Sequence, residues 1–192
     1  MKNIYSIFIF SCLFFGFYSC KNASADSKSA APASRETLKA SIQAMEDSVT
    51  TLSGQKSTGA MLSLSQQELI NRLTAYFRNY PEDPYSADCL FKVQMVYSGL
   101  NAHRKSIAYG DTLLNKFPGY KNKYLVIESN IAALDVFLEP RDTAEIHRYY
   151  NMLLSDNEYP NSKKAEIKRR LKHLDLSIFE YASLPKNKAI KK

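Results

Sequence analysis

Three aromatic-proline pairs recur along this chain at a spacing that constrains its fold more than any other feature. Tyr80-Pro81, Phe117-Pro118 and Tyr159-Pro160 each end an apolar helical stretch, and successive pairs lie 37 and 42 residues apart. A recurrence in this range is typical of stacked helical hairpins, because each hairpin leaves one apolar face uncovered until the next unit packs on it. The spacing therefore predicts helical repeats and favours an adaptor over an enzyme.

The segments around these pairs have helical periodicity. Apolar residues recur at intervals of three and four, and the alternation typical of half-buried strands is missing. We therefore expect an all-α fold. The first stretch, 35–52, spaces its apolar residues as a heptad-like seam of about two heptads, which is short for a coiled coil. We expect this seam to pack on the repeats rather than on a second chain; its members are Leu38, Ile42, Met45, Val49 and Leu52.

Local signals predict where the repeat helices begin and end. The serine and glutamate of 65–68 have the spacing of a capping box and predict a helix that begins at Ser65. Asp83-Pro84 supplies an N-cap and a first-turn proline for a helix that Gly99 ends. Further helices are predicted over about 102–117 and 123–138, and the chemistry of a capping box recurs at 142–145.

After Pro160 the sequence predicts one closing helix that extends to residue 178. Its apolar stripe consists of Ile167, Leu171, Leu174 and Ile178, and its other faces carry Lys164, Lys168, Arg169, Arg170 and Lys172. A polar outer face is what the end of a repeat array requires. The whole formal net charge of +7 lies between Lys163 and the C-terminus. We interpret these charges as a solvated face; anionic headgroups, lipopolysaccharide phosphates or an acidic partner are the alternative ligands.

The N-terminal segment resembles a bacterial lipoprotein signal. Lys2 precedes an apolar run of fifteen residues, Ile4 to Tyr18, which is short for a membrane span. Ser19-Cys20 then supplies the small residue and the cysteine that would receive lipid. Residues 1–19 are thus expected to be a signal peptide, and 20–34 a lipidated cysteine followed by a flexible tether rich in Ser, Ala, Asn and Lys. An uncleaved anchor or an ordinary signal peptide is the alternative.

The same resemblance suggests a location. In bacterial lipoproteins an aspartate directly after the lipidated cysteine tends to retain the protein in the inner membrane, and here that position is Lys21. An acidic cluster that would mark surface export is missing, since only Asp26 precedes Glu36. The resemblance therefore implies a lipid-anchored protein of the outer membrane that faces the periplasm. The remaining expected divisions are an N-terminal helix and loop over 35–64, a repeat domain over 65–181 and a disordered basic tail over 182–192.

The stretch 79–88, with sequence NYPEDPYSAD, resembles the junction between tetratricopeptide repeats in bacterial envelope proteins. It is most similar to the repeat lipoprotein of the outer-membrane β-barrel assembly machinery and to the periplasmic factor that coordinates division with peptidoglycan synthesis. The resemblance covers about 65–175 and implies a short right-handed α-solenoid with an extra N-terminal helix and a C-terminal capping helix. Ser106 matches the small-residue position of a second helix, whereas Gly110 stands where a bulky residue is usual.

In tetratricopeptide-like repeats, residues of the first helix of each hairpin line a groove. That resemblance implies a partner-binding groove in which an apolar peptide or helix lies between flanking carboxylates. The groove residues would be Asp88, Phe91, Gln94 and Met95 in one unit and Glu128, Ala132 and Asp135 in the next. Alternatively, the N-terminal helix over 35–52 packs on these residues and occludes the groove.

Catalytic and metal-binding patterns are missing from the sequence. His103, His147 and His173 are isolated on different predicted helices and are expected at the surface or its boundary, and we expect no metal and no cofactor. Cys89 lies on an apolar helix face and is interpreted as a small core residue; a reactive thiol is the alternative. We found neither a phosphate-binding glycine loop nor a Gly-x-Ser-x-Gly elbow.

The sequence therefore predicts a non-catalytic lipoprotein that acts as a periplasmic scaffold for a protein partner, in outer-membrane protein assembly or envelope maintenance. Its contact with the membrane would be the N-terminal lipid, and neither nucleic acid nor a small-molecule substrate is expected. Binding of peptidoglycan or a polysaccharide is the main alternative. A hydrolase is the third hypothesis, and a pocket with two or more convergent titratable groups would favour it.

Overall fold

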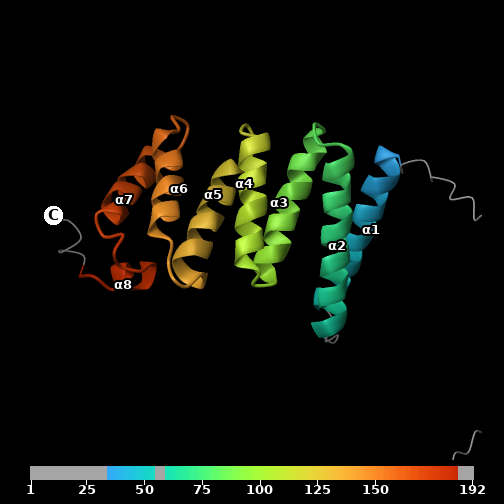
Figure 1. The fold of residues 1–192 in the computed structure, drawn as a ribbon, viewed down its shortest axis with the longest axis horizontal. Coiled ribbons are helices and arrows are strands. Elements are labelled where there is room, and N and C mark those ends of the chain that lie inside the picture. Colours follow the sequence, from blue (N-terminus) through green and yellow to red (C-terminus); the bar gives the residue numbers. More distant parts are fainter. Residues whose placement is uncertain (1–33, 55–58, 186–192) are drawn as a thin grey trace, which may run out of the picture. The chain divides into compact units, whose positions relative to one another are not determined.

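A computed structural model describes residues 34–54 and 59–185, and within them the fold is all-helical, as predicted (Figure 1). The predicted signal peptide, Cys20 and most of the tether lie outside these residues, as do positions 186–192 of the predicted tail. The elements are α1 (Arg35–Gly54), α2 (Gly59–Asn79), α3 (Pro84–Gly99), α4 (His103–Lys116), α5 (Lys123–Ala132), the π-helical η1 (Ala133–Phe137), α6 (Thr143–Ser155), α7 (Asn161–Leu171) and α8 (Ile178–Ala182).

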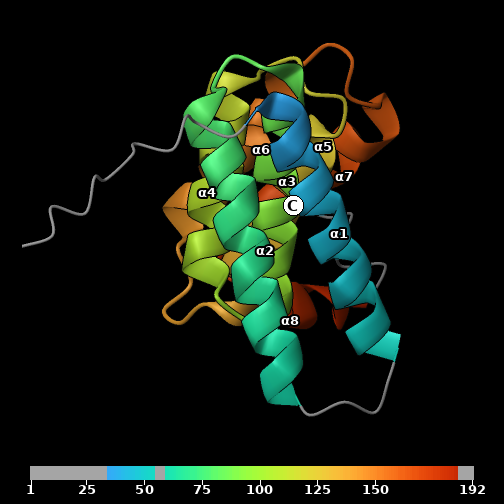
Figure 2. The same cartoon turned by 90° about the vertical axis from the view of Figure 1, so that its right-hand side faces the viewer.

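The helices from α1 to α7 are arranged in the order in which they occur along the chain. Each packs on the helix that follows it, and Figure 1 shows this succession from the side, whereas Figure 2 looks along it with α1 and α2 in front. The three aromatic-proline pairs follow α2, α4 and α6, so the recurrence that stands out in the sequence marks the end of every second helix. Antiparallel helix pairs joined by short turns are the basic unit of this fold.

The hydrophobic core has two clusters that meet along α3. The first joins α1, α2 and α3, and in it Ile42 of α1 is fully buried beside Leu73 and Val93. The second joins α3, α4, α5, α6 and α7 around Leu113, Val126 and Ile146. Three further residues of the α1 seam, Leu38, Met45 and Val49, pack against the first cluster. The apolar residues of α1 therefore pack on α2 and α3 of the same chain, as expected.

The predicted N-caps at Asp83 and Asp142 are confirmed, and the one at Ser65 is wrong. The Asp83 side chain accepts a hydrogen bond from the Tyr85 N–H and Pro84 occupies the first turn of α3, as expected. Asp142 likewise accepts from the Glu145 N–H at the start of α6, but the Glu145 carboxylate pairs with Arg148, so only half of the predicted capping box forms. In contrast, α2 begins at Gly59, so Ser65 lies inside the helix and caps nothing. The residues between Gly59 and Ser65 include Ala, Met and two Leu, which are strong helix formers and let the helix extend toward the N-terminus.

The predicted closing helix is also wrong in its extent. It ends at Leu171 as α7, Leu174 lies in a turn, and Ile178 begins the separate helix α8. The cause is Arg170, which was expected on the solvated face but is 4% exposed. Its guanidinium donates to the backbone carbonyls of His173 and Leu176, and these contacts hold the chain in a reversal.

The predicted helix over 123–138 has the expected extent but changes character in its last part. α5 continues directly into η1, which contacts both α4 and α6. Single π-helical turns inserted in α-helices occur frequently at functional sites. Here η1 carries the buried carboxylate of Asp135.

A buried chain of hydrogen bonds links α3, α5, α6 and α4. Gln94 Nε2 donates to Asn130 Oδ1 at 2.9 Å, Asn130 Nδ2 donates to the Tyr149 hydroxyl at 2.9 Å, and that hydroxyl donates to Asp111 at 2.7 Å. Gly110 lies against this network, and a Cβ added there would be 2.8 Å from both terminal atoms of Asn130. The network therefore explains why a bulky residue is missing from this position.

One surface contact leads to a prediction about pH. The Lys123 ammonium, 2.6 Å from the Asp156 carboxylate, and the Glu158 N–H lower the pKa of Asp156 from 3.8 to about 2. Because the folded-state pKa is depressed, this contribution to stability is complete above the unfolded-state pKa of 3.8 and is lost as the pH falls toward 2. The Asp156→Asn variant should therefore be less stable than the wild type at pH 7, and the two should converge near pH 2.

Urea unfolding at a series of pH values measures this effect. Asp47→Asn is the matched control, because Asp47 is exposed and bonds only Gln43 through its side chain among the described residues. The control should follow the wild-type curve over the whole range. A constant difference between Asp156→Asn and wild type from pH 7 to pH 2 would show that the ion pair does not depress the pKa of Asp156.

Candidate functional site

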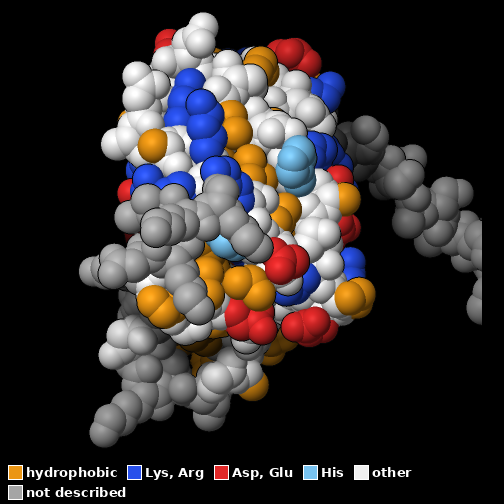
Figure 3. All heavy atoms as spheres, turned by 90° about the vertical axis from the view of Figure 1, so that its left-hand side faces the viewer, with side chains coloured by type: hydrophobic (Ala, Val, Ile, Leu, Met, Phe, Trp, Pro, Cys, Tyr) orange, Lys and Arg blue, Asp and Glu red, His pale blue; other side chains and the backbone are white. Residues whose placement is uncertain are grey.

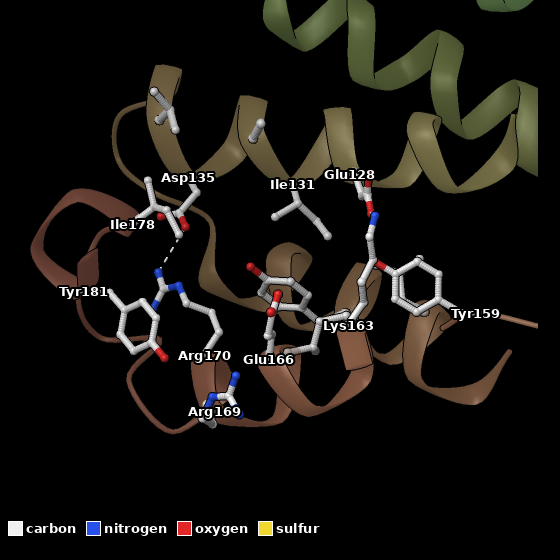
Figure 4. A pocket seen from close by; sticks show the side chains of 15 residues that line it. Glu128, Ile131, Asp135, Tyr159, Lys163, Glu166, Arg169, Arg170, Ile178 and Tyr181 are labelled. Carbon is white, nitrogen blue, oxygen red and sulfur yellow. Dashed lines mark hydrogen bonds and ion pairs between the residues drawn. The ribbon is translucent and has the colours of Figure 1, made fainter. Parts of the chain in front are cut away.

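A pocket of about 550 Å³ lies between α5, η1, α6, α7 and α8 (Figure 4). Its mouth is at the surface, because Ala132, Lys163, Glu166 and Arg169 are exposed. Ligand-binding pockets fall in this range of volumes and are lined mainly by apolar side chains with a few polar groups. Its lining consists of Glu128, Ile131, Ala132, Asp135, Val136, Tyr150, Leu153, Tyr159, Lys163, Glu166, Ile167, Arg169, Arg170, Ile178 and Tyr181.

The apolar part of the lining comes from every surrounding element. Ile131 projects from α5, Leu153 from α6, Ile167 from α7 and Ile178 from α8. Leu153 and Ile167 also belong to the second core cluster, so the deep wall of the pocket is continuous with the core. Burial in the core fixes these side chains, which gives the pocket a defined shape.

Glu128 and Lys163 meet at one end of the pocket. Their ion pair measures 2.8 Å, and the Tyr159 hydroxyl donates to the same Glu128 oxygen at 2.7 Å. Partial burial favours the protonated acid, but these two donors hold the pKa of Glu128 below its ordinary value. Burial and the Glu128 charge raise the pKa of Tyr159. Glu128 is therefore a carboxylate engaged within the chain.

Asp135 forms the opposite end of the pocket with two arginines. Arg141 contacts Asp135 Oδ1 at 2.7 Å and Arg170 contacts Oδ2 at 3.0 Å. Figure 4 shows Arg170 reaching from α7 toward Asp135, with Glu166 between this end and Lys163. The side chains of Asp135, Arg170 and Arg141 are 2%, 4% and 15% exposed. One buried carboxylate thus pairs with two guanidiniums, and the charge of Arg141 also acts on the Glu180 carboxylate.

The predicted groove residues divide into two sets. Glu128, Ala132 and Asp135 line the pocket together. Asp88 instead bonds the Tyr120 hydroxyl and pairs with Lys121, Phe91 packs against Tyr120, and Met95 is 44% exposed. These three lie outside the pocket lining.

Two of the predicted groove residues are buried. Gln94 is fully buried and bonds Asn130, so it contributes to the packing of α3 on α5. Asp135 is engaged by two guanidiniums. Neither side chain is free to flank a bound peptide as the groove interpretation requires, because Gln94 is fully buried and both carboxylate oxygens of Asp135 are engaged by guanidiniums.

The sequence left open whether the N-terminal helix, α1, covers the predicted groove residues. The answer differs between the groove residues of α3 and those of α5 and η1. α1 packs on α2 and reaches α3 through an ion pair between Glu46 and Lys92. It contributes no residue to the pocket lining among the described positions. Residues of α7 and α8 line the pocket on the side facing α5 and η1. Sequence reasoning missed Ile178 and Tyr181, although the capping box of Ser177 and Glu180 marks the start of α8.

The remaining candidate groups for catalysis or metal binding are dispersed. His147 is exposed and His173 is half-buried, but His103 is 8% exposed and stacks on Phe137, so its expected place near the surface is wrong. Cys89 is a buried core residue as expected, and burial raises the pKa of its thiol to about 12. Within 34–54 and 59–185, no three His, Cys, Asp or Glu side chains come together as a metal site.

The hydrolase hypothesis requires convergent titratable groups, and the pocket does bring three carboxylates to its lining: Glu128, Asp135 and Glu166. Two of them are held by cations, and the pKa of Glu128 is lowered, whereas a general acid at neutral pH needs a raised one. The charge of Glu166 acts on the Tyr159 hydroxyl and raises its pKa.

The outer face of α7 is strongly basic. Figure 3 looks onto this end of the fold and shows Lys and Arg side chains gathered beside hydrophobic ones. Lys163, Lys168, Arg169 and Lys172 are exposed, whereas Arg170 is buried. The basic run of the sequence thus separates into a solvated face and one internal cation.

Comparison with known proteins gives no relative: no family model, no curated protein and no solved structure matches this chain. Among the described helices, none combines the length and the apolar character that crossing a bilayer requires.

Proposed function

We propose that this chain is a non-catalytic adaptor of the bacterial outer membrane, anchored by lipid at Cys20 and facing the periplasm. In this proposal the helices form a short right-handed solenoid of tetratricopeptide-like hairpins. The α5–α8 pocket receives a segment of another envelope protein, in outer-membrane protein assembly or envelope maintenance. The order of helix packing and the recurrence of the aromatic-proline pair after α2, α4 and α6 support the repeat interpretation.

The observation that carries the binding role is the chemistry of the pocket lining. It combines an apolar wall continuous with the core, an exposed mouth, and carboxylates that are mostly paired within the chain. Such a site can bury apolar side chains of a partner, which contributes about 25 cal/mol per Å² of apolar surface removed from water. Helical repeats commonly recognise extended or helical peptides in this way.

Photo-crosslinking in intact cells tests this proposal. A photoreactive phenylalanine analogue replaces Ala132 at the pocket mouth in one strain, and Asn115, an exposed residue of α4 outside the pocket, in a control strain. We expect a discrete protein adduct from position 132 and none from position 115. No adduct from position 132, or the same adducts from both positions, contradicts a binding role for the pocket.

Binding of an envelope polymer makes a different prediction. A polymer binder should sediment with purified peptidoglycan sacculi, or bind an envelope polysaccharide, without any protein partner. We expect this protein to remain in solution when mixed with sacculi. Sedimentation that is lost when Ala132 is replaced by a bulky residue would favour the polymer over the protein partner.

A further inference from the structure

The helix α7 presents a row of lysines that the stability of the helix does not explain. Lys164, Lys168 and Lys172 are spaced by four, so they follow one side of α7 as far as its C-terminal cap. Lys168 and Lys172 are exposed, and Lys164 is half-buried. Like charges four apart on a helix repel one another. Lys164 also lies in the first turn of α7, which contains no acidic residue and where the helix dipole disfavours a cation.

Two of these lysines are not neutralised within the fold. Lys163, on the same helix, forms an ion pair with Glu128 at 2.8 Å. In contrast, neither Lys164 nor Lys168 forms an ion pair with a carboxylate of 34–54 or 59–185. A solvated face explains why the two side chains can be charged, but it does not explain why the charges are repulsive and all of one sign. An anionic surface outside the chain would remove this repulsion.

An exposed aromatic side chain lies at the same end of the fold. Phe179 of α8 is 69% exposed. α8 is held against the C-terminal end of α7, because the Tyr181 ring lies 5.6 Å from the His173 ring and Arg170 donates to the Leu176 carbonyl at 2.7 Å. Figure 3 shows cationic and hydrophobic side chains together on this face of the molecule. The α7–α8 end thus combines positive charge with exposed apolar surface.

The sequence after α8 has the same character. Four of the seven residues over 186–192 are lysines, none is acidic, and Ala189-Ile190 lies between them. Clusters of four to eight basic residues are typical of surfaces that bind anionic lipid headgroups. An acidic protein would match the lysines and leave Phe179 in water. A bilayer matches both, because its phosphates lie outside the apolar layer that accepts aromatic side chains.

We infer that the α7–α8 end of the fold binds the surface of a bilayer that contains anionic phospholipids. The lysines of α7 contact lipid phosphates, and Phe179 enters the boundary between headgroups and acyl chains. This contact is additional to the proposed lipid at Cys20. It also does not depend on what binds in the pocket, since Lys164, Lys168 and Phe179 lie outside the pocket lining.

A single tryptophan can report this contact, because the chain contains none. The Phe179→Trp variant of the full chain is mixed with vesicles of phosphatidylcholine, alone or mixed with phosphatidylglycerol. We expect the emission to shift to shorter wavelength, and to be quenched by lipids brominated on their acyl chains, when phosphatidylglycerol is present. The response should be largely lost at about 1 M salt, where the Debye length is about 3 Å.

Leu125→Trp is the matched control. Leu125 is another exposed apolar residue, 49% exposed, but it lies on α5. Any attachment of the chain to vesicles through its N-terminal segment affects both variants, so only contact at the α7–α8 end distinguishes them. The tryptophan at position 125 should not be quenched. Equal quenching at the two positions, or no response at position 179 to phosphatidylglycerol, overturns the inference.

Lysine substitutions test the electrostatic part in the Phe179→Trp background. A lysine at an anionic surface contributes about fivefold in affinity, so Lys164→Gln/Lys168→Gln should raise the lipid concentration for half of the response by about tenfold or more. Lys105→Gln/Lys116→Gln removes the same charge from exposed positions of α4 and should leave that concentration unchanged. Circular dichroism checks that both double variants are folded. Equal lipid requirements for the two double variants contradict the inference.

An acidic protein as the ligand of this face gives a different result. Polyglutamate would then bind the wild-type chain, and binding would be lost in Lys164→Gln/Lys168→Gln. Vesicles with phosphatidylglycerol would leave the tryptophan at position 179 unchanged. That combination assigns the lysines to a protein ligand and overturns the inference.

Discussion

Replacing Asp135 with alanine is expected to lower the free energy of unfolding by about 3–5 kcal/mol, the cost of removing one partner of a buried ion pair. The substitution leaves Arg141 and Arg170 close together with no carboxylate, and their side chains are only 15% and 4% exposed. Both guanidiniums also bind carbonyls between His173 and Leu176, so repulsion between them should loosen the turn that carries α8.

Denaturant unfolding measures the loss, and Asp47→Ala is the matched control. Asp47 is an exposed aspartate of α1 whose side chain bonds Gln43, and its removal should change the unfolding free energy by less than about 0.5 kcal/mol. A loss below about 1 kcal/mol for Asp135→Ala would be typical of an exposed ion pair and would show that the cluster is not buried.

The Gly110→Ala substitution should also destabilise the fold, by about 1–3 kcal/mol, as expected for overpacking of a filled interior. Alanine normally stabilises a helix relative to glycine by about 1 kcal/mol, so the sign of the effect is itself informative. The added Cβ would lie 2.8 Å from Asn130 Nδ2 and Oδ1. Asn130 cannot move away freely, because it is fully buried and both atoms are bonded, one to Gln94 and the other to Tyr149.

Gly99→Ala provides the comparison, since a Cβ at Gly99 would meet nothing within 4 Å. That variant should be neutral or slightly stabilising in the same thermal or denaturant unfolding experiment. In the double variant Gly110→Ala/Asn130→Ala, the loss should be smaller than the sum of the two single losses, because the clash disappears with the amide. If the single substitution Gly110→Ala stabilised the protein, α4 and α5 would not be as close at Gly110 and Asn130 as the structure shows.

The sequence contained enough information for the class of fold and for most helix boundaries. Strong local signals decide these features: Asp83-Pro84 starts α3 through a cap and a fixed φ, and the aromatic-proline pair recurs after alternate helices. The misplaced start of α2 shows the limit of this reasoning. Ser65 and Glu68 have the spacing of a capping box. The residues before them have high helix propensity, so extending the helix to Gly59 costs little free energy.

The pocket was only partly predictable. Glu128, Ala132 and Asp135, which were assigned to a groove by their positions on a first helix, line the pocket together, whereas Arg170 was assigned to solvent with its basic neighbours and is buried. Periodicity alone does not reveal that Arg170 is buried, because its partner Asp135 lies 35 positions earlier on a different helix. The burial of Gln94 could not be predicted for the same reason. Its hydrogen-bond partner Asn130 lies on a different helix, and the bond depends on how α3 packs on α5.

The most direct test of the central claim is to map the adduct formed from position 132 in intact cells, by digesting it and identifying the attached residue by mass spectrometry. The account predicts attachment to one envelope protein, within an apolar stretch of its sequence. Attachment to a glycan strand, to a lipid, or to α7 or α8 of this chain itself would contradict a pocket that receives a protein partner.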